Sequence, residues 1–325
     1  MLVVEPMTRQ FSHLIIAFSF FALIFSIANP TFAQSKARKK TKKPDLPPLK
    51  RILLETKDGV ELQADWLAGE GTKETLPIIL VHDWDSDRVA LRPLAEYLQK
   101  KHRHAVIVPD LRGHGESLNV KGSDKELDRT RFKKNQIGSM AQDIDSCRRF
   151  LQTKNDEGEL NLDMLVVLAC GKSNAFAAAW CIGDWQWPPV GGIKQGQNVK
   201  TLIMLSPAKR FKGMQLSKII KDQLFSSKTS SLPTLVIWGV NEQDAADSQS
   251  IYETMKKNRS EPEYDDDAVR WENKRLFHAN YDSAETSEAL LRQQGMGLFK
   301  TIALFIEKKV VAQKAQLTWQ NRSGK

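Results

Sequence analysis

The stretch that decides the fold is AVIVPDLRGHGES, residues 105–117. Its first part, Ala105–Val108, is wholly apolar, which is typical of a strand buried on both faces of a parallel sheet. Pro109-Asp110 ends this strand. Gly113 and Gly115 then permit the positive-φ conformations that a tight reversal of the chain requires. The stretch therefore predicts a buried strand followed by a turn over the edge of a sheet.

The chain on either side of this stretch alternates between strand-like and helix-like segments. Asp58-Gly59 separates two alternating segments, 51–56 and 60–67, and predicts a β-hairpin. Apolar runs of strand length follow at 77–81, 105–108, 164–170, 199–205 and 235–238, and a further strand is expected at 269–277. Apolar residues at helical spacing fall within 91–98, 137–151, 174–182, 216–224, 245–255 and 298–310. This order predicts an α/β protein: a mostly parallel, doubly wound sheet with an antiparallel N-terminal hairpin and helices on both faces.

Two turns at the expected carboxyl edge of the sheet resemble turns of the α/β-hydrolase superfamily. Asp110–Ser117 matches the pattern D-x-R-G-x-G-x-S, and His82 follows the strand at 77–81. That superfamily often has His-Gly at the latter position, in the loop that supplies an oxyanion-hole amide. The resemblance covers residues 51–310 and implies an α/β-hydrolase-like fold. We interpret Asp110–Ser117 itself as architectural.

The turn after the strand at 164–170 is where α/β hydrolases carry their nucleophile, in a G-x-S-x-G motif. Here the sequence is LVVLACGKSNAFAAAW, residues 165–180. Cys170 is excluded as the turn residue because large residues stand two positions away on both sides. Gly171 has small residues at both positions and would keep the turn without a nucleophile. Ser173 would supply a nucleophile but needs a strand two residues longer, so we favour Gly171 and keep Ser173 as the alternative.

The resemblance also implies where an acid and a histidine should stand. Glu242 and Asp244 follow the strand at 235–238, and either could orient a histidine or cap the next helix. His278 is the only histidine beyond His114, and hence the only candidate base. An active serine hydrolase of ester or peptide-like substrates would use Ser173, His278 and Asp244 or Glu242. The amides of Asn174 and of the residue after His82 would form its oxyanion hole.

Asp83 stands where the superfamily often has glycine. A carboxylate there opposes the negative charge that an oxyanion hole must stabilise. Because the nucleophile, acid and base positions also depart from the family pattern, the sequence predicts a catalytically degenerate protein. Such a protein would bind a ligand or partner near His82, Asp83, Gly171 and Asn174. The active serine hydrolase remains the alternative, and a structural protein held at a surface by its basic segment is a third possibility.

The N-terminus has the pattern of a secretory signal peptide. Arg9 precedes an apolar stretch, 14–28, and small residues at Thr31 and Ala33 suit cleavage after Ala33. We therefore expect a secreted or periplasmic protein, with an uncleaved membrane anchor as the alternative. The predicted organisation is a signal peptide at 1–33, a basic disordered linker at 34–50, the domain at 51–315 and a C-terminal tail at 316–325.

The net charge of +9 is unevenly placed along the chain. Residues 34–51 carry eight Lys and Arg against Asp45, which leaves only +2 for 52–325. This distribution does not support nucleic-acid binding by the domain, whereas the basic segment 36–51 suits contact with an anionic surface. The expected partner of the domain is a small molecule or another protein, which the sequence does not identify.

The sequence contains few groups suited to cross-linking, metal binding or cofactor binding. Cys147, Cys170 and Cys181 lie in apolar surroundings and are expected to be buried, although one pair could bridge in an oxidising compartment. His102 and His104 have no further ligand at metal-binding spacing. No glycine-rich phosphate loop is present, so the sequence predicts no metal and no cofactor.

Overall fold

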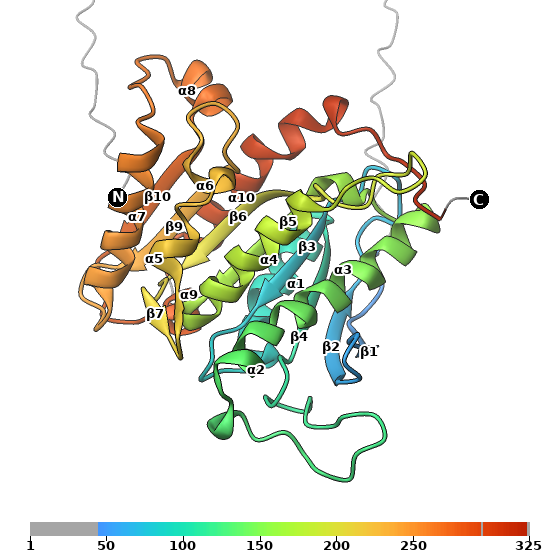
Figure 1. Ribbon diagram of the computed structural model, residues 1–325. Helices are drawn as coiled ribbons and strands as arrows, with labels where there is room; N and C mark the ends of the chain where they lie inside the picture. The colour runs from blue at the N-terminus through green and yellow to red at the C-terminus, as the bar shows by residue number, and fades with distance from the viewer. Residues whose placement is uncertain (1–44, 294, 324–325) are drawn as a thin grey trace, which may run out of the picture. The chain divides into compact units, whose positions relative to one another are not determined.

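An eight-stranded sheet with the order β1-β2-β4-β3-β5-β6-β9-β10 organises the chain (Figure 1). The computed structural model describes residues 45–293 and 295–323, so the predicted signal peptide and most of the linker lie outside the described residues. β2 pairs antiparallel with β1 and with β4, and all other neighbours are parallel. The strands are β1 Lys50–Glu55, β2 Glu61–Leu67, β3 Pro77–Val81, β4 Ala105–Pro109, β5 Leu165–Cys170, β6 Val199–Leu205, β9 Thr234–Gly239 and β10 Leu276–Tyr281. This confirms the predicted N-terminal hairpin and the mostly parallel sheet.

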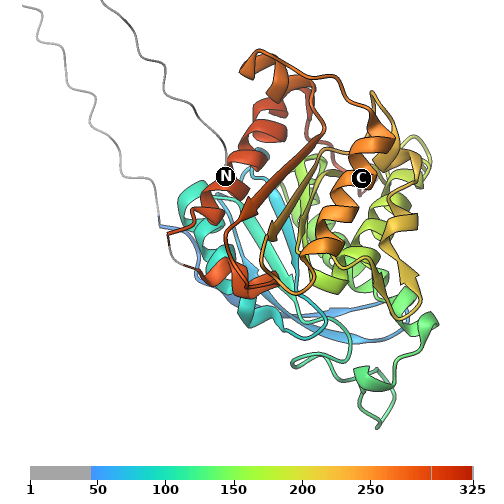
Figure 2. The same cartoon turned by 90° about the vertical axis from the view of Figure 1, so that its left-hand side faces the viewer.

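Helices cover both faces of the sheet, as predicted from the alternation of elements (Figure 2). Successive strand residues point to opposite faces, so Ile78 joins one hydrophobic core and Ile79 the other. The core with Ile78 is closed by α1 Arg92–His102, α9 Ser287–Arg292 and α10 Leu298–Lys309. The core with Ile79 is closed by α2 Lys134–Ser139, α3 Ala141–Asp156, α4 Asn174–Gln186 and α7 Ala245–Arg259. Short 3₁₀ helices lie at Arg88–Leu91, Arg129–Arg131, Leu162–Met164, Gly171–Ser173 and Val311–Gln316. Within the described residues, no helix is long and apolar enough to cross a membrane.

The strand predicted at 269–277 is wrong. Residues Asp267–Asn273 form a helix, α8, and the last strand of the sheet is β10, which begins only at Leu276. The side chain of Asp266 caps the helix by accepting a hydrogen bond from the backbone N–H of Val269 at 2.8 Å. Val269 is 45% exposed, so its β-branched side chain gains nothing from burial in a sheet. The cap therefore outweighs the strand propensity of the segment.

The single helix predicted at 216–224 is also wrong. The segment 208–231 contains a two-stranded hairpin, β7 Arg210–Phe211 with β8 Met214–Gln215, and two short helices, α5 Leu216–Ile219 and α6 Gln223–Ser226. Asp222 separates the helices, because its side chain accepts a hydrogen bond from Leu224 N at 2.9 Å and begins a new helix there.

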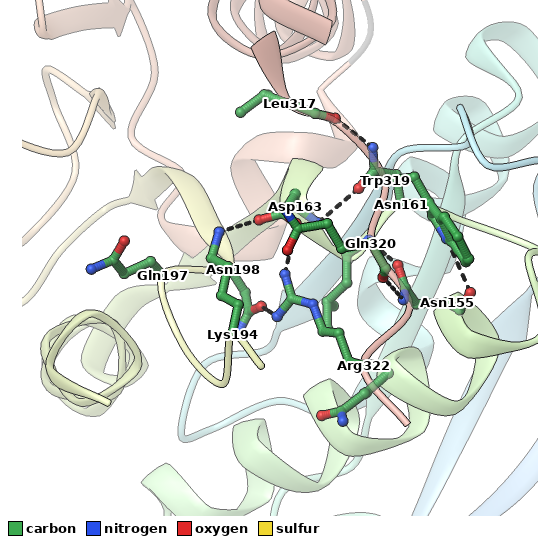
Figure 3. Close-up of polar contacts among 12 residues, drawn as sticks. Asn155, Asn161, Asp163, Lys194, Gln197, Asn198, Leu317, Trp319, Gln320 and Arg322 are labelled. Atoms are coloured by element: carbon green, nitrogen blue, oxygen red, sulfur yellow. Dashed lines mark hydrogen bonds and ion pairs between the residues drawn. The ribbon is translucent and has the colours of Figure 1, made fainter. Parts of the chain in front are cut away.

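The C-terminal segment that was predicted as a tail packs against the domain as far as residue 323 (Figure 3). Trp319 donates from Nε1 to the carbonyl oxygen of Asn155 at 3.1 Å. The Arg322 guanidinium is buried, and its Nη2 lies 2.8 Å from Oδ2 of Asp163, just before β5. Asn161 donates from Nδ2 to the carbonyl of Leu317 at 2.7 Å. The segment therefore secures the edge of the sheet where the parallel strands begin, away from their carboxyl ends.

The three cysteines are buried and free. Burial raises the pKa of Cys170 and of Cys181 well above the usual thiol value, and nearby carboxyl groups add to the effect, Glu288 and Asp83 at Cys170 and Asp184 at Cys181. The thiols therefore remain protonated, and they pack as small apolar side chains.

Candidate active site at the carboxyl edge of the sheet

The turn between β5 and α4 reverses at Gly171. This residue directly follows β5 and has φ of +51°, in the left-handed region that favours glycine. Ser173 has ordinary helical dihedrals, with φ of −69° and ψ of −17°, and lies just before α4. A Cβ atom placed on Gly171 would lie less than 3.0 Å from three atoms of the Asp83 carboxyl group. The resemblance to α/β hydrolases implies a nucleophilic side chain at position 171. In this structure the Asp83 carboxyl group fills the space that such a side chain would occupy.

The Asp83 carboxylate is held by two backbone amides and a hydroxyl. Its Oδ1 accepts hydrogen bonds from Trp84 N and Lys172 N, each at 2.7 Å. Its Oδ2 accepts from Ser287 Oγ at 3.0 Å. Burial raises the pKa of Asp83, although the amides of Lys172 and Trp84 and the Ser287 hydroxyl act in the opposite direction. The two amides, one after β3 and one after Gly171, are arranged around a single oxygen atom, as an oxyanion hole would arrange them.

A second carboxyl group, Glu288 in the first turn of α9, lies beside Asp83. Its Oε1 accepts a hydrogen bond from Asp83 N at 2.6 Å, so the amide of the residue after His82 is already engaged. Burial raises the pKa of Glu288 to about 7, and the nearby Asp83 charge adds to the effect. Asn174, the other predicted contributor, donates from Nδ2 to the carbonyl oxygens of Gly171 and Leu205 at 2.8 and 3.2 Å.

The acid position is occupied by Glu242, which contacts serines and a backbone amide. Its Oε2 accepts from Ser206 Oγ at 2.8 Å and from Gly239 N at 3.2 Å. Its Oε1 accepts from Ser248 Oγ at 3.2 Å. Ser206 Oγ also accepts from Ser287 N at 2.9 Å, so a hydrogen-bonded chain runs from Glu242 through two serines to the carboxylate at the elbow.

Both serines in this hydrogen-bonded network have strained backbone conformations. Ser206 follows β6 with φ of +46°, and Ser287 begins α9 with φ of +50°. Positive φ at a residue with a side chain costs of order 1–3 kcal/mol and persists only where surrounding contacts impose it. Sequence analysis missed Ser206, Ser287 and Glu288. The sequence offered only their positions as an indication, because each lies in a segment that follows a strand of the sheet.

The residues proposed for serine hydrolysis are not brought together. Ser173 is fully buried, and its Oγ donates to the carbonyl oxygen of His82 at 2.6 Å. His278 is the third residue of β10, and its ring packs at a tilt against Tyr252 with the centroids 4.4 Å apart. Asp244 is exposed at the start of α7. Among the described residues, no hydrogen bond or ion pair links Ser173 to His278, or His278 to Glu242 or Asp244.

His82 is buried and connects two loops through hydrogen bonds of its imidazole ring. Its Nε2 accepts a hydrogen bond from Leu111 N at 3.0 Å, so its Nδ1 carries the proton and donates to Asp83 O at 2.6 Å. Burial, together with the neighbouring His114, lowers the pKa of His82 to about 3. The imidazole is therefore neutral at physiological pH and ties the loop after β3 to the turn after β4.

The turn at 110–117 has the architectural role that we predicted. Asp110 accepts hydrogen bonds from Arg88 N at 2.8 Å and from Glu116 N at 2.9 Å. Ser117 donates from Oγ to the carbonyl of Asp110 at 2.8 Å. A Cβ on Gly115 would overlap the Asp110 carboxyl group, so the close approach requires glycine.

Aromatic and basic side chains cover this network. Trp84 is 6% exposed, with its ring centroid 4.7 Å from that of Phe211 in β7 and 4.9 Å from that of His114. The ammonium group of Lys212 lies 4.6 Å from the Trp84 ring centroid. Within the described part of the chain, no group of three or more His, Cys, Asp or Glu side chains is placed to hold a metal ion. Together with the hydrogen bonds around Asp83, these side chains form a closely packed cluster at the carboxyl edge of the sheet.

Comparison with solved structures finds esterases with the same architecture. A Pyrococcus furiosus esterase matches with a TM-score of 0.55 and 15% identity, over 81% of this chain and 92% of that chain. EstE1, a thermostable carboxylesterase cloned from a metagenomic library, matches with a TM-score of 0.56 and 11% identity, over 83% and 91%. A Rhizomucor miehei esterase matches with a TM-score of 0.55 and 12% identity, over 84% and 86%. No protein-family model and no curated protein matches the chain. At these identities the likeness shows a shared fold.

Proposed function

We propose that this chain, which has the α/β-hydrolase fold, does not hydrolyse esters or peptides through a serine and acts by binding a ligand or protein partner. One observation carries the proposal: the Asp83 carboxylate fills the space beside Gly171 and accepts hydrogen bonds from both neighbouring amides. Acyl transfer needs those amides free to stabilise the oxygen of a tetrahedral intermediate. Here they already serve a fixed carboxylate.

The charge of that carboxylate supports the same conclusion. An oxyanion that formed beside Gly171 would face Asp83 at close range in a buried site, where like charges repel strongly. Glu288 accepts a hydrogen bond from Asp83 N, so a second carboxyl group, when ionised, adds to the negative potential there. Preorganised donors lower the barrier of acyl transfer, whereas preorganised acceptors raise it.

The position of Ser173 is a further argument. A serine nucleophile needs a base within hydrogen-bond reach to take its proton. The Ser173 hydroxyl instead donates to the His82 carbonyl, and the His82 ring has a pKa of about 3 and is already hydrogen-bonded at both nitrogens. The serine therefore lacks an activating base among the described residues.

The test is labelling of the purified protein with a fluorophosphonate probe, followed by intact-mass measurement and peptide mapping. We expect no adduct on protein shown to be folded by circular dichroism. A stoichiometric adduct on Ser173 that disappears in Ser173→Ala would contradict the proposal. The matched control is Ser323→Ala, which changes a serine near the C-terminus and leaves all the candidate catalytic residues in place.

The alternative is an active serine hydrolase that uses Ser173, His278 and Asp244 or Glu242. The esterase neighbours favour it, because proteins with this fold and that activity are the ones found. The alternative requires Ser173 to leave the His82 carbonyl and a histidine to approach it. It predicts that His278→Ala reduces labelling of Ser173, whereas the binding proposal predicts no effect on labelling.

We also propose that the chain is exported and cleaved after Ala33. The proposal rests on the charge and apolar pattern of residues 1–33. Expression of the full chain in a bacterial host, followed by cell fractionation and N-terminal sequencing, tests it. A secreted or periplasmic product that begins at Gln34 is expected, and a full-length product in the membrane fraction would instead indicate an anchor.

A further inference from the structure

A cavity of about 690 Å³ lies beside the edge strand β10, outside the cluster around Asp83. Its walls come from the second half of α7, the loop 260–265, α8 and the start of β10. The volume falls within the range of about 300–1,000 Å³ that is typical of small-molecule sites. His278, which the sequence offered as the only candidate catalytic base, lines this cavity and not the cluster around Asp83.

One wall of the cavity is aromatic. The ring of His278 lies 4.4 Å from Tyr252 and 5.7 Å from Trp238, measured between centroids, and it is nearly parallel to the indole. Tyr252 and Trp238 are buried, at 7% and 5% exposed, whereas His278 is exposed. Buried neighbours hold the imidazole in place, and because His278 is exposed its ring can contact a planar group in the cavity.

Cations slightly outnumber carboxylates in the lining of the cavity, which contains Lys256, Lys257, Arg259, Arg270 and Lys274 against Glu253, Glu261, Glu263 and Asp265. Among the described residues, neither Lys256 nor Lys274 forms an ion pair. Burial lowers the pKa of Lys274, which indicates a partly desolvated ammonium group. Arg259 is fully buried in the wall, and its Nη1 has no hydrogen-bond partner in the described structure. The nearest carboxylate to that nitrogen, Glu261, is 3.9 Å away. The buried charge of Arg259 therefore adds to the attraction of the cavity for an anion.

The carboxylates around the cavity restrict the charge of the ligand. Glu261 accepts hydrogen bonds from Arg275 N at 2.9 Å and from Leu276 N at 3.2 Å, so backbone amides already stabilise its charge. Glu253, Glu263 and Asp265 also line the cavity, and all three are exposed. These groups would repel a ligand with several negative charges. A single negative charge near the two lysines is favoured over a polyanion.

We propose that this cavity binds a small planar organic monoanion, of the aromatic carboxylate class. Its carboxylate lies between the ammonium groups of Lys256 and Lys274, and its ring packs against His278 and Tyr252. The site is separate from the Asp83 cluster, so the inference extends the proposed function and holds whether or not the chain hydrolyses esters.

The test is an NMR titration of the purified chain with benzoate, observed at the imidazole Cε1–H of His278 and assigned with His278→Gln. We expect a saturable shift with benzoate. Lys256→Gln and Lys274→Gln are each expected to weaken binding at least about 5-fold. Lys300→Gln, a matched change of an exposed lysine in α10, leaves binding unchanged. Circular dichroism establishes that each variant is folded.

Three outcomes would overturn the proposal. Benzamide, the neutral analogue, could bind as tightly as benzoate, which would remove the role of charge. The Lys256 and Lys274 variants could bind benzoate like Lys300→Gln, which would place the ligand elsewhere. Finally, benzoate could fail to shift the His278 resonance while phenyl phosphate shifts it, which would assign the cavity to a more highly charged ligand.

Discussion

Substitution of Gly171 tests whether the Asp83 carboxylate occupies the place of a nucleophilic side chain. Gly171→Ala introduces a Cβ at φ of +51°, less than 3.0 Å from the Asp83 carboxyl group. The left-handed backbone costs about 1–2 kcal/mol, and the overpacking costs about 1–3 kcal/mol more. We therefore expect Gly171→Ala to lower the free energy of unfolding by about 2–5 kcal/mol. Gly191→Ala is the matched control, because Gly191 has φ of +58° with nothing within 4 Å of its Cβ position. It should cost only about 1–2 kcal/mol.

A double-mutant cycle separates the steric contribution from the backbone contribution. Asp83→Ala removes the overlapping atoms and leaves the amides of Trp84 and Lys172 without their acceptor, at a cost of about 1–3 kcal/mol. In that background Gly171→Ala should cost only the backbone penalty of about 1–2 kcal/mol. The two substitutions should therefore couple favourably by about 1–3 kcal/mol. The measurement is equilibrium denaturation in urea at pH 7, with circular dichroism and tryptophan fluorescence as coincident probes.

Additive effects would refute this reasoning. If the double variant is destabilised by the sum of the single effects within about 0.5 kcal/mol, Asp83 and Gly171 do not compete for one space. If Gly171→Ala is no more destabilising than Gly191→Ala, the carboxylate can move aside easily. If Gly171→Ala does not fold alone but folds when combined with Asp83→Ala, the coupling is demonstrated directly.

Three further predictions concern Glu288, Arg322 and Gly115. Glu288 has a pKa raised to about 7, so folding favours its protonated form. The free energy of unfolding should therefore fall by up to about 3 kcal/mol as pH rises from about 4.5 through 7. Glu288→Gln should flatten that dependence in urea midpoints measured at pH 5 and pH 8, and an unchanged slope would assign it to other groups. Truncation after residue 316 removes the buried ion pair of Arg322 with Asp163 and should lower the thermal midpoint by an amount equivalent to about 3 kcal/mol or more, whereas truncation after residue 323 should not. Gly115→Ala, whose Cβ would overlap the Asp110 carboxyl group, should cost about 2–5 kcal/mol in chemical denaturation, against about 1–2 kcal/mol for Gly122→Ala, which has open space at φ of +75°. Equal costs for these two glycine variants would contradict the proposed close approach.

Local patterns in the sequence were sufficient to predict the layered fold. Asp58-Gly59 forms the turn of the hairpin, and Gly59 has φ of +80°. The apolar runs at 77–81 and 105–108 became buried neighbouring strands because wholly apolar segments of that length are stable only with both faces covered. Where weak propensities competed with a helix cap, as at 266–276, prediction from pattern failed. The cap depends on one side chain, Asp266, and does not alter hydrophobic periodicity.

The candidate site could be predicted only in part. The glycine at the elbow and the unusual Asp83 were visible in the sequence, because each stands at the end of a predicted strand. Their contact was not visible, since Asp83 and Gly171 are 88 positions apart and meet only when β3 and β5 pair. Ser206 and Ser287 escaped notice for the same reason, because a serine has no distinctive pattern until its hydrogen-bond partner is known.

The sequence by itself determined the alternation of strands and helices outside the segments 208–231 and 266–276, the two apolar faces of the sheet and the turns that require glycine. These features depend on neighbours within about ten residues, where periodicity and backbone sterics act. Only the tertiary structure decided that Asp83 accepts both amides at the elbow, that Glu288 lies beside it, and that His278 lines a separate cavity at β10. Parallel pairing brings together the carboxyl ends of strands that are distant in the chain, so the chemistry of that edge depends on contacts that no local pattern encodes.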